Sequence, residues 1–238
     1  MPGNKTAIVT GAQQGIGAGV VEGFLKSGYS VVATSRRASE SLRPATNLVV
    51  VDGDIRERET AAKTVEAAVT RFETVDVLVN NAGIYVTKSF TEFTPDDFNM
   101  LVSVNLLGFL YMTQLVVKQM LKQKSGCVIT ISAALADNPI AGVNASVSMI
   151  TKGGLNTATR HLAIEYANQG IRFNAVAPGV VDTPLHRDSP KEHLRSLQPM
   201  GSFAEISDIV DAVLYLSNAR QVTGEVLHVD GGAHVGHW

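Results

Sequence analysis

The stretch TGAQQGIG occupies residues 10–17, after the apolar run AIV at 7–9 and before a segment with the pattern of a helix at 16–27. Glycines at 11, 15 and 17 permit a tight turn, a close approach of the backbone to a pyrophosphate, and close packing of helix on strand. The N-terminus of the following helix offers unpaired N–H groups and a positive dipole end. The pattern indicates a dinucleotide site, although glycine-rich turns also join strands to helices for steric reasons alone.

Strand-like and helix-like segments alternate along the rest of the chain. The apolar runs at 49–51 and 128–131 are continuous, which is typical of parallel strands covered by helices on both faces. The sequence therefore predicts an α/β fold, a single Rossmann-like doubly wound parallel sheet with helices on both faces. We expect strands at 6–10, 30–35, 47–51, 75–80, 126–132, 171–176 and 226–229, and helices at 16–27, 57–72, 95–122, 148–168 and 205–217.

The chain has 238 residues, which is within the size that one α/β domain reaches. No repeat, low-complexity tract or flexible linker divides it, so we expect a single dinucleotide-binding and catalytic domain over 1–238. The least regular stretch, 182–204, holds three prolines, two histidines and mixed charge. We expect a flap over a substrate pocket there, with an ordinary surface loop as the alternative.

Composition narrows the class of partner. A formal net charge of −2 with 45% hydrophobic residues indicates a globular protein with a large core, and argues against nucleic acid or an anionic membrane as partner. The only cysteine, Cys127, lies in a strand-like run, so no internal disulfide forms and we expect a cytoplasmic protein. The uncharged stretch 100–117 contains polar residues and is predicted to be a buried helix rather than a membrane span.

Small or polar residues end several of the predicted strands. In an open α/β sheet the carboxyl ends of the strands face one crevice, and ligands bind where the strand order reverses. We therefore expect these strand ends to converge on a small-molecule ligand: TG at 10–11, TS at 34–35, NNAG at 80–83, Ser132, and PG at 178–179.

These motifs, together with Asn105, KGGL at 152–155, Thr183 and DGG at 230–232, occur in the order and approximate spacing of one family. The whole chain resembles the short-chain dehydrogenase/reductases. The resemblance implies a nicotinamide cofactor in the crevice and transfer of a hydride to or from a carbonyl or alcohol carbon.

The resemblance also implies four catalytic positions, three of which carry the family's residue. Asn105 corresponds to the asparagine that holds a water in a proton relay, Ser132 to the hydroxyl that orients the substrate oxygen, and Lys152 to the ammonium that grips the nicotinamide ribose. The fourth position, a tyrosine acid/base four residues before the lysine, is Ser148 here. An alternative alignment from Ser132 forward yields no tyrosine either. A serine hydroxyl lacks the tunable acidity of a phenol, so Ser148 does not simply replace it.

Three outcomes follow from the missing tyrosine. Another group can donate the proton, with Tyr85, His186, or a water held by Asn105, Lys152 and Ser148 as candidates. The substrate can be an imine or a conjugated system that needs less help from an acid. The chain can also bind the cofactor without turnover, as a sensor or structural subunit. We favour an NADP-dependent reductase, most simply of ketones, with a non-standard proton donor.

NADP is predicted because no acidic residue ends the second strand. The sequence ATSRR at 33–37 offers a small hydroxyl and then guanidinium groups that can hold a 2′-phosphate. Asp54 resembles the family's acidic contact to the adenine ring, or is an ordinary strand-end aspartate. The expected cofactor-binding residues are Thr10, Gly11, Gln14, Gly15, Ile16, Gly17, Ser35, Arg36, Arg37, Asp54, Asn81, Ala82, Gly83, Lys152, Pro178, Gly179 and Thr183.

Three further expectations concern the substrate, the assembly and metals. The substrate pocket is expected to include Tyr85, Val143, Leu185 and His186. The helix predicted near 95–122 is apolar around almost its whole circumference, so we expect a homo-oligomer, a dimer or tetramer, to cover it. Histidines at the C-terminal end lack a cysteine or carboxylate cluster with ligand spacing, and we expect no metal site.

Overall fold

The computed structural model describes residues 5–186 and 190–236. Seven strands form one sheet in the order β3-β2-β1-β4-β5-β6-β7, and every neighbouring pair is parallel. The predicted doubly wound parallel sheet is therefore confirmed. The strands are β1 (Thr6–Thr10), β2 (Ser30–Ser35), β3 (Leu48–Asp52), β4 (Val77–Asn80), β5 (Gly126–Ile131), β6 (Ile171–Pro178) and β7 (Val226–Val229).

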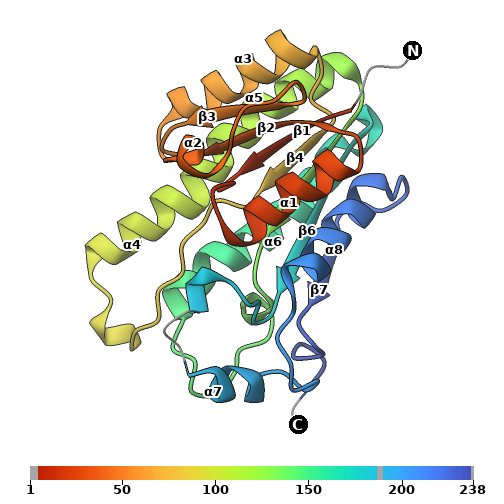
Figure 1. Cartoon of the computed structure of the whole chain (residues 1–238). Helices are drawn as coiled ribbons and strands as arrows, with labels where there is room; N and C mark the ends of the chain where they lie inside the picture. The colour runs from red at the N-terminus through yellow and green to blue at the C-terminus, as the bar shows by residue number, and fades with distance from the viewer. Residues whose placement is uncertain (1–4, 187–189, 237–238) are drawn as a thin grey trace.

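Helices cover both faces of the sheet (Figure 1). Helices α1 and α8 pack on one face, with Phe24 and Leu216 buried there, and α3 and α5 pack on the other, around Met112 and Met120. The α-helices are α1 (Gly15–Lys26), α2 (Ala38–Ser41), α3 (Arg58–Phe72), α4 (Pro95–Leu101), α5 (Gly108–Gln123), α6 (Ser146–Tyr166), α7 (Lys191–Ser196) and α8 (Ile206–Asn218). Shorter helical segments are η1 (Phe90–Glu92), η2 (Val102–Leu107), η3 (Ala134–Ala136), η4 (Ala167–Gln169) and η5 (Pro184–His186).

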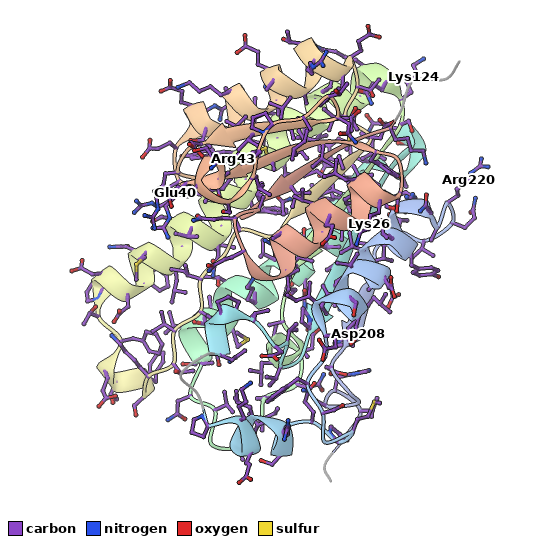
Figure 2. All side chains as sticks on the ribbon, viewed as in Figure 1. Lys26, Glu40, Arg43, Lys124, Asp208 and Arg220 are labelled. Carbon is purple, nitrogen blue, oxygen red and sulfur yellow. The ribbon has the colours of Figure 1, made fainter. Side chains whose placement is uncertain are left out.

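Strand β1 shows why its residues are continuously apolar. Ala7 and Val9 belong to the core on the α1 and α8 face, whereas Ile8 belongs to the core on the α3 and α5 face. Successive side chains of a strand point to opposite faces, so a strand covered on both sides has no solvent-facing position. Charged side chains lie at the periphery instead, as Lys26, Lys124 and Arg220 do in Figure 2.

The prediction of a regular helix over 95–122 is wrong in one respect. Residues Val102–Leu107 form a π-helix between α4 and α5, so the helix is widened in its middle. The whole run Pro95–Gln123 is long and apolar enough to cross a membrane. Its α5 part packs against β4 and β5 and buries Met112, Val116 and Met120, as a core helix does. The other predicted elements differ from the observed ones by a few residues at their ends.

The order of the strands reverses between β1 and β4, and Thr10 joins the two strand ends. Its hydroxyl accepts hydrogen bonds from the N–H groups of Asn81 and Ala82, both at 3.0 Å. The side-chain amide of Asn81 in turn donates to the carbonyl oxygens of Thr10 at 2.9 Å and Gly11 at 3.1 Å. The bonds hold the two carboxyl ends together at the switch point, where ligands of this fold class bind.

The segment predicted as a flap begins beyond β6. Its described part contains η5 and α7, while residues 187–189 lie outside the described residues. Figure 1 places α7 at the bottom of the molecule, near the C-terminus and at the opposite end from the N-terminus.

Candidate active site

A cavity of about 930 Å³ opens along the carboxyl ends of the strands. All the predicted cofactor-binding residues except Thr10 line it. Of the four predicted catalytic residues, Ser132 and Lys152 line the cavity, whereas Asn105 and Ser148 do not. The four predicted substrate residues, Tyr85, Val143, Leu185 and His186, all line it.

The glycine loop makes one wall of this cavity and admits no larger side chain at its centre. A Cβ atom on Gly17 would lie 2.2 Å from the carbonyl oxygen of Gly11 and 2.5 Å from the side-chain nitrogen of Asn81. Gly11 and Gly15 have φ angles of +65° and +55°, in the left-handed region that favours glycine. Helix α1 starts at Gly15 with no side-chain cap, so its first N–H groups are available to an anion.

The end of β2 carries two hydroxyl groups that the protein leaves without partners. Thr34 Oγ1 and Ser35 Oγ are buried, and neither has a hydrogen-bond partner among the residues described. Arg36 and Arg37 follow them and line the same cavity. Buried polar atoms are normally paired, so unpaired hydroxyls beside guanidinium groups fit the hydroxyls and phosphates of a bound nucleotide.

Asp54 forms an ion pair with Arg56, which no sequence motif predicted as a site residue. The Arg56 guanidinium donates to the Asp54 carboxylate, with Nη2 at 2.6 Å from Oδ2. These bonds from Arg56 lower the pKa of the Asp54 carboxyl, and Arg36 adds to the effect. Both Asp54 and Arg56 line the cavity, so a third guanidinium stands near Arg36 and Arg37. No motif singled out Arg56, because its position relative to the β2 end depends on how β3 pairs with β2.

Lys152 and Ser132 hold one another at the end of β5. Lys152 Nζ donates to the carbonyl oxygen of Ile131 at 2.8 Å, and the Ser132 hydroxyl donates to the carbonyl oxygen of Lys152 at 3.3 Å. The ammonium and the hydroxyl are thus each anchored on a backbone carbonyl, and both residues line the cavity. The surrounding protein excludes water from the ammonium, and this desolvation lowers the pKa of Lys152 to about 8.

Asn105 lies in the π-helical segment, behind the cavity wall. Its Oδ1 accepts from the N–H of Ile84 at 2.8 Å, and its Nδ2 donates to the carbonyl of Ile84 at 3.0 Å and to the Thr151 hydroxyl at 2.9 Å. Asn105 Oδ1 and Lys152 Nζ each lie 3.2 Å from the point where a Cβ of Gly83 would be. The side chain therefore joins the NNAG loop, η2 and α6, and both of its amide N–H groups have acceptors. π-Helical turns frequently occur at functional sites.

Ser148 is directed away from the cavity. Its side chain is 0% exposed, its hydroxyl donates to the carbonyl of Val86 at 2.8 Å, and the same oxygen accepts from the N–H of Val86 at 2.9 Å. The hydroxyl thus satisfies both polar groups of one backbone residue. Ser148, four residues before Lys152, therefore holds the loop after the NNAG motif onto α6.

The predicted substrate residues differ in their ionisation. Burial raises the pKa of the Tyr85 phenol, and burial lowers the pKa of the His186 imidazole, opposed by the Asp182 carboxylate. Leu185 is exposed at the mouth of the cavity. The lining therefore combines apolar side chains with few groups that change charge near neutral pH.

Gln198 lines the cavity, and no sequence motif predicted it. It is 2% exposed, and its Nε2 donates to the carbonyl oxygens of Val180 at 3.1 Å and Ser202 at 2.8 Å. Its Oε1 is buried without a hydrogen-bond partner in the described part of the chain and would lie 2.7 Å from a Cβ of Gly179. Gln198 therefore ties the end of the predicted flap to the strand end that carries Pro178 and Gly179.

The histidines near the C-terminus form no metal site in the part of the chain that the structure describes. His228 and His234 stack with ring centroids 4.0 Å apart. His234 Nδ1 lies 3.0 Å from both carboxylate oxygens of Asp230, and His228 Nε2 lies 3.6 Å from Asp137. His228 on β7 thus lies near the loop that follows η3, whereas the contact of His234 with Asp230 stays within the segment after β7.

Comparison with known proteins gives relatives of the same length. A 3-oxoacyl-[acyl-carrier-protein] reductase of Thermotoga maritima is 33% identical over 96% of this chain and 97% of its own. An L-xylulose reductase of Bos taurus is 33% identical over 96% of both chains. A 3-ketoacyl-(acyl-carrier-protein) reductase of Brucella melitensis, solved in complex with NADH, superposes with a TM-score of 0.91 at 31% identity, covering 97% of this chain and 98% of the other.

A second solved structure, ElxO with NADP bound, has a TM-score of 0.90 and 30% identity, covering 98% of this chain and all of its own. Solved neighbours thus hold either nicotinamide nucleotide, and the glycine loop and the unpaired hydroxyls of this chain fit such a cofactor. The family model described as Enoyl-(Acyl carrier protein) reductase matches residues 11–234. With its parallel sheet, its glycine loop and these full-length relatives, the chain belongs to the short-chain dehydrogenase/reductase family, whose members are oxidoreductases.

Proposed function

We propose that this protein is an NADP(H)-dependent reductase of a small carbonyl compound that works without the family's tyrosine. The observation that carries the proposal is the pairing of Ser132 with Lys152 in the wall of the same cavity that the glycine loop borders. A bound nicotinamide would supply or accept the hydride. The cavity residues then have to hold the reacting carbon of the substrate close to the nicotinamide and deliver one proton to the substrate oxygen.

The roles of the two cavity-facing catalytic residues follow from their positions. The Ser132 hydroxyl, which makes one long bond of 3.3 Å, is free to turn and donate to a substrate oxygen. The Lys152 ammonium, anchored on Ile131, would bind the hydroxyls of the nicotinamide ribose. Orientation of this kind supplies about 7–11 kcal/mol of a barrier in favourable cases. Reduction can therefore proceed, more slowly, when the acid is weak.

The preference for NADP rests on the charges around the end of β2. Arg36, Arg37 and Arg56 line the cavity, where the Asp54 carboxylate is paired with Arg56, and the exposed Glu40 lies 3.5 Å from Arg37. Asp52, the last residue of β3, accepts from the N–H of Ser39 at 2.9 Å. Guanidinium groups hold phosphate in bidentate fashion, and an additional phosphate is what distinguishes NADP from NAD.

The proton donor is non-standard in this proposal, because the Ser148 hydroxyl is bound to Val86 on both sides. The same observation favours two alternatives. Imines and conjugated substrates need less acid catalysis than ketones, and a protein that only binds the nucleotide needs none.

The proposal includes a cytoplasmic homo-oligomer, a dimer or a tetramer. Apolar side chains exposed on α4, α5 and α6 support it, because large exposed apolar patches are usually covered by a partner. These side chains are Phe98, Met100, Leu110, Ile150 and Ile164. Sedimentation analysis tests this part, and a single monomeric species contradicts it.

Turnover of a substrate panel tests the function itself. Oxidation of NADPH and of NADH is followed with ketones, imines and enones, alongside direct measurement of the affinity for both nucleotides by calorimetry. We expect ketone reduction with NADPH. Turnover of imines or enones alone supports the first alternative, binding without any turnover supports the second, and no binding of either nucleotide rejects the proposal.

A further inference from the structure

We infer that the Lys152 ammonium itself gives the proton to the substrate oxygen, in place of the missing phenol. The inference rests on the proposed reductase function and specifies how the proton is delivered. It assigns Lys152 a role beyond binding the ribose.

The geometry leaves protons of the ammonium available on the cavity side. Within residues 5–186 and 190–236, Lys152 Nζ makes one hydrogen bond, to the carbonyl of Ile131, although it has three N–H groups. A Cβ on Gly83 would come within 3.2 Å of Nζ, so the lack of a side chain there leaves space next to the ammonium. The ammonium is anchored on Ile131, the residue before Ser132, and the Ser132 hydroxyl bonds to the Lys152 backbone carbonyl, so both groups belong to the same part of the cavity wall.

The other polar side chains near Lys152 already have hydrogen-bond partners. The Ser148 hydroxyl both donates to and accepts from Val86, so it has no proton to give without breaking that contact. The two amide protons of Asn105 go to the Ile84 carbonyl and the Thr151 hydroxyl. The second lysine of the cavity wall, Lys88, is paired with the Asp97 carboxylate at 2.7 Å.

Acid strength separates Lys152 from the remaining titratable groups in the wall. Burial raises the pKa of Tyr85, which makes its phenol a weaker acid than an ordinary tyrosine. Burial lowers the pKa of His186, so its imidazole is largely unprotonated near neutral pH. Lys152, with a pKa lowered to about 8, is still protonated near neutral pH and is a much stronger acid than an ordinary lysine.

The step balances without another reagent. A bound reduced nicotinamide would supply the hydride for the new C–H bond; as the π electrons of the carbonyl move to oxygen, that oxygen takes a proton from Lys152 Nζ. The two electrons of that hydride reduce the carbonyl to an alcohol, and Lys152 is left as a neutral amine. A proton from solvent restores the ammonium before the next turnover.

Chemical rescue of Lys152→Ala tests the assignment. We expect this variant to lose about 10²–10⁴-fold in the single-turnover rate at saturating NADPH, which is the usual contribution of a general acid. Added methylammonium is expected to restore the rate by about tenfold or more, with stronger alkylammonium acids of similar size working better. Tetramethylammonium carries the same charge but has no N–H proton to donate, and it is expected to leave the rate of the variant unchanged. Lys118→Arg, on an exposed lysine of α5, is the control and keeps the wild-type rate.

A second measurement needs no turnover. Reductive methylation with ¹³C-formaldehyde gives each lysine an NMR signal, and the signal absent from Lys152→Arg identifies Lys152. We expect this signal to titrate near pH 8, and the wild-type rate to fall above the same pH.

The outcomes separate the inference from the proposed function. Equal rescue by tetramethylammonium, a Lys152→Ala rate near wild type, or a rate that stays level through the titration of Lys152 overturns the proton-donor role alone. Absence of turnover by wild-type protein on every carbonyl, imine and enone overturns the proposed reductase and the donor role together.

Discussion

The hydroxyl of Ser148 and the backbone of Val86 bind each other twice, since Ser148 Oγ donates to the Val86 carbonyl at 2.8 Å and accepts from its N–H at 2.9 Å. Ser148 therefore links α6 to the loop that follows β4. The chemistry of the site and the stability of this loop therefore depend on different residues.

Ser148→Ala is expected to lower stability much more than activity. The substitution leaves the partly buried N–H and carbonyl of Val86 without their protein partner, which costs up to about 1–3 kcal/mol per unsatisfied group. Urea unfolding measures the loss, and the single-turnover rate is expected to stay within about tenfold of wild type, far less than removal of a general acid costs. Ser146→Ala, at an exposed serine of the same helix, serves as the control. An unchanged midpoint with an abolished rate contradicts this prediction.

Gly17→Ala is expected to damage both the fold and the cofactor site. Its methyl group would lie 2.2 Å from the Gly11 carbonyl oxygen, so the glycine loop has to move, at a cost of about 1–3 kcal/mol for overpacking. Thermal unfolding and NADPH calorimetry report the two effects. Gly236→Ala is the matched control, since nothing lies within 4 Å of the added atom. If Gly17→Ala binds NADPH as tightly as wild type, the loop does not contact the cofactor.

Replacing Arg36 and Arg37 together by Ala is expected to remove the preference for NADP. Hydrogen bonds to a charged group contribute about 1.5–3 kcal/mol, so NADPH binding should weaken by about tenfold to a hundredfold or more. NADH binding should change little, because its ribose carries no additional phosphate. Arg43→Ala is the control, since Arg43 bonds only to the Ser39 carbonyl in the described structure and lies outside the cavity wall. Equal weakening for both nucleotides would show that the arginines do not read the 2′-phosphate.

Asp97 is expected to contribute to the free energy of unfolding at neutral pH and to lose this contribution at low pH. Bonds from Lys88 and Thr94 lower the pKa of its carboxyl to about 2 in the folded protein, below the value of about 3.9 in an unfolded chain. Its contribution is therefore present above about pH 4 and lost as the pH falls through about 2. Unfolding of Asp97→Asn and wild type at several pH values measures this, with the gap closing in acid. A gap that is constant from neutral pH to pH 2 contradicts the assignment.

Cys127 is expected to be unreactive in the native protein. Burial raises the pKa of its thiol to about 11, so the reactive thiolate is scarce at pH 8, and the side chain lies in β5 under α8. A disulfide reagent should label it only on unfolding, with one equivalent per chain because it is the only cysteine. Labelling within seconds in native buffer would mean that the strand opens.

The sequence by itself determined the secondary-structure elements and the position of the glycine loop. Continuous apolar runs between helical segments predict a parallel sheet, and glycines at 11, 15 and 17 predict a close approach to a phosphate, because these patterns depend on residues near each other in the chain. The polar strand ends also converge as expected, since parallel strands end at one edge of a sheet.

Only the tertiary structure decided which side chains face the cavity. Ser148 and Val86 are 62 positions apart, and their contact turns the hydroxyl away from the site. The π-helical turn that places Asn105, the pairing of Arg56 with Asp54 near Arg36, and the burial of Gln198 beside Gly179 likewise gave no signal in the pattern. The direction of a side chain depends on which distant backbone groups need a partner, and that is settled only when the strands and helices have packed together.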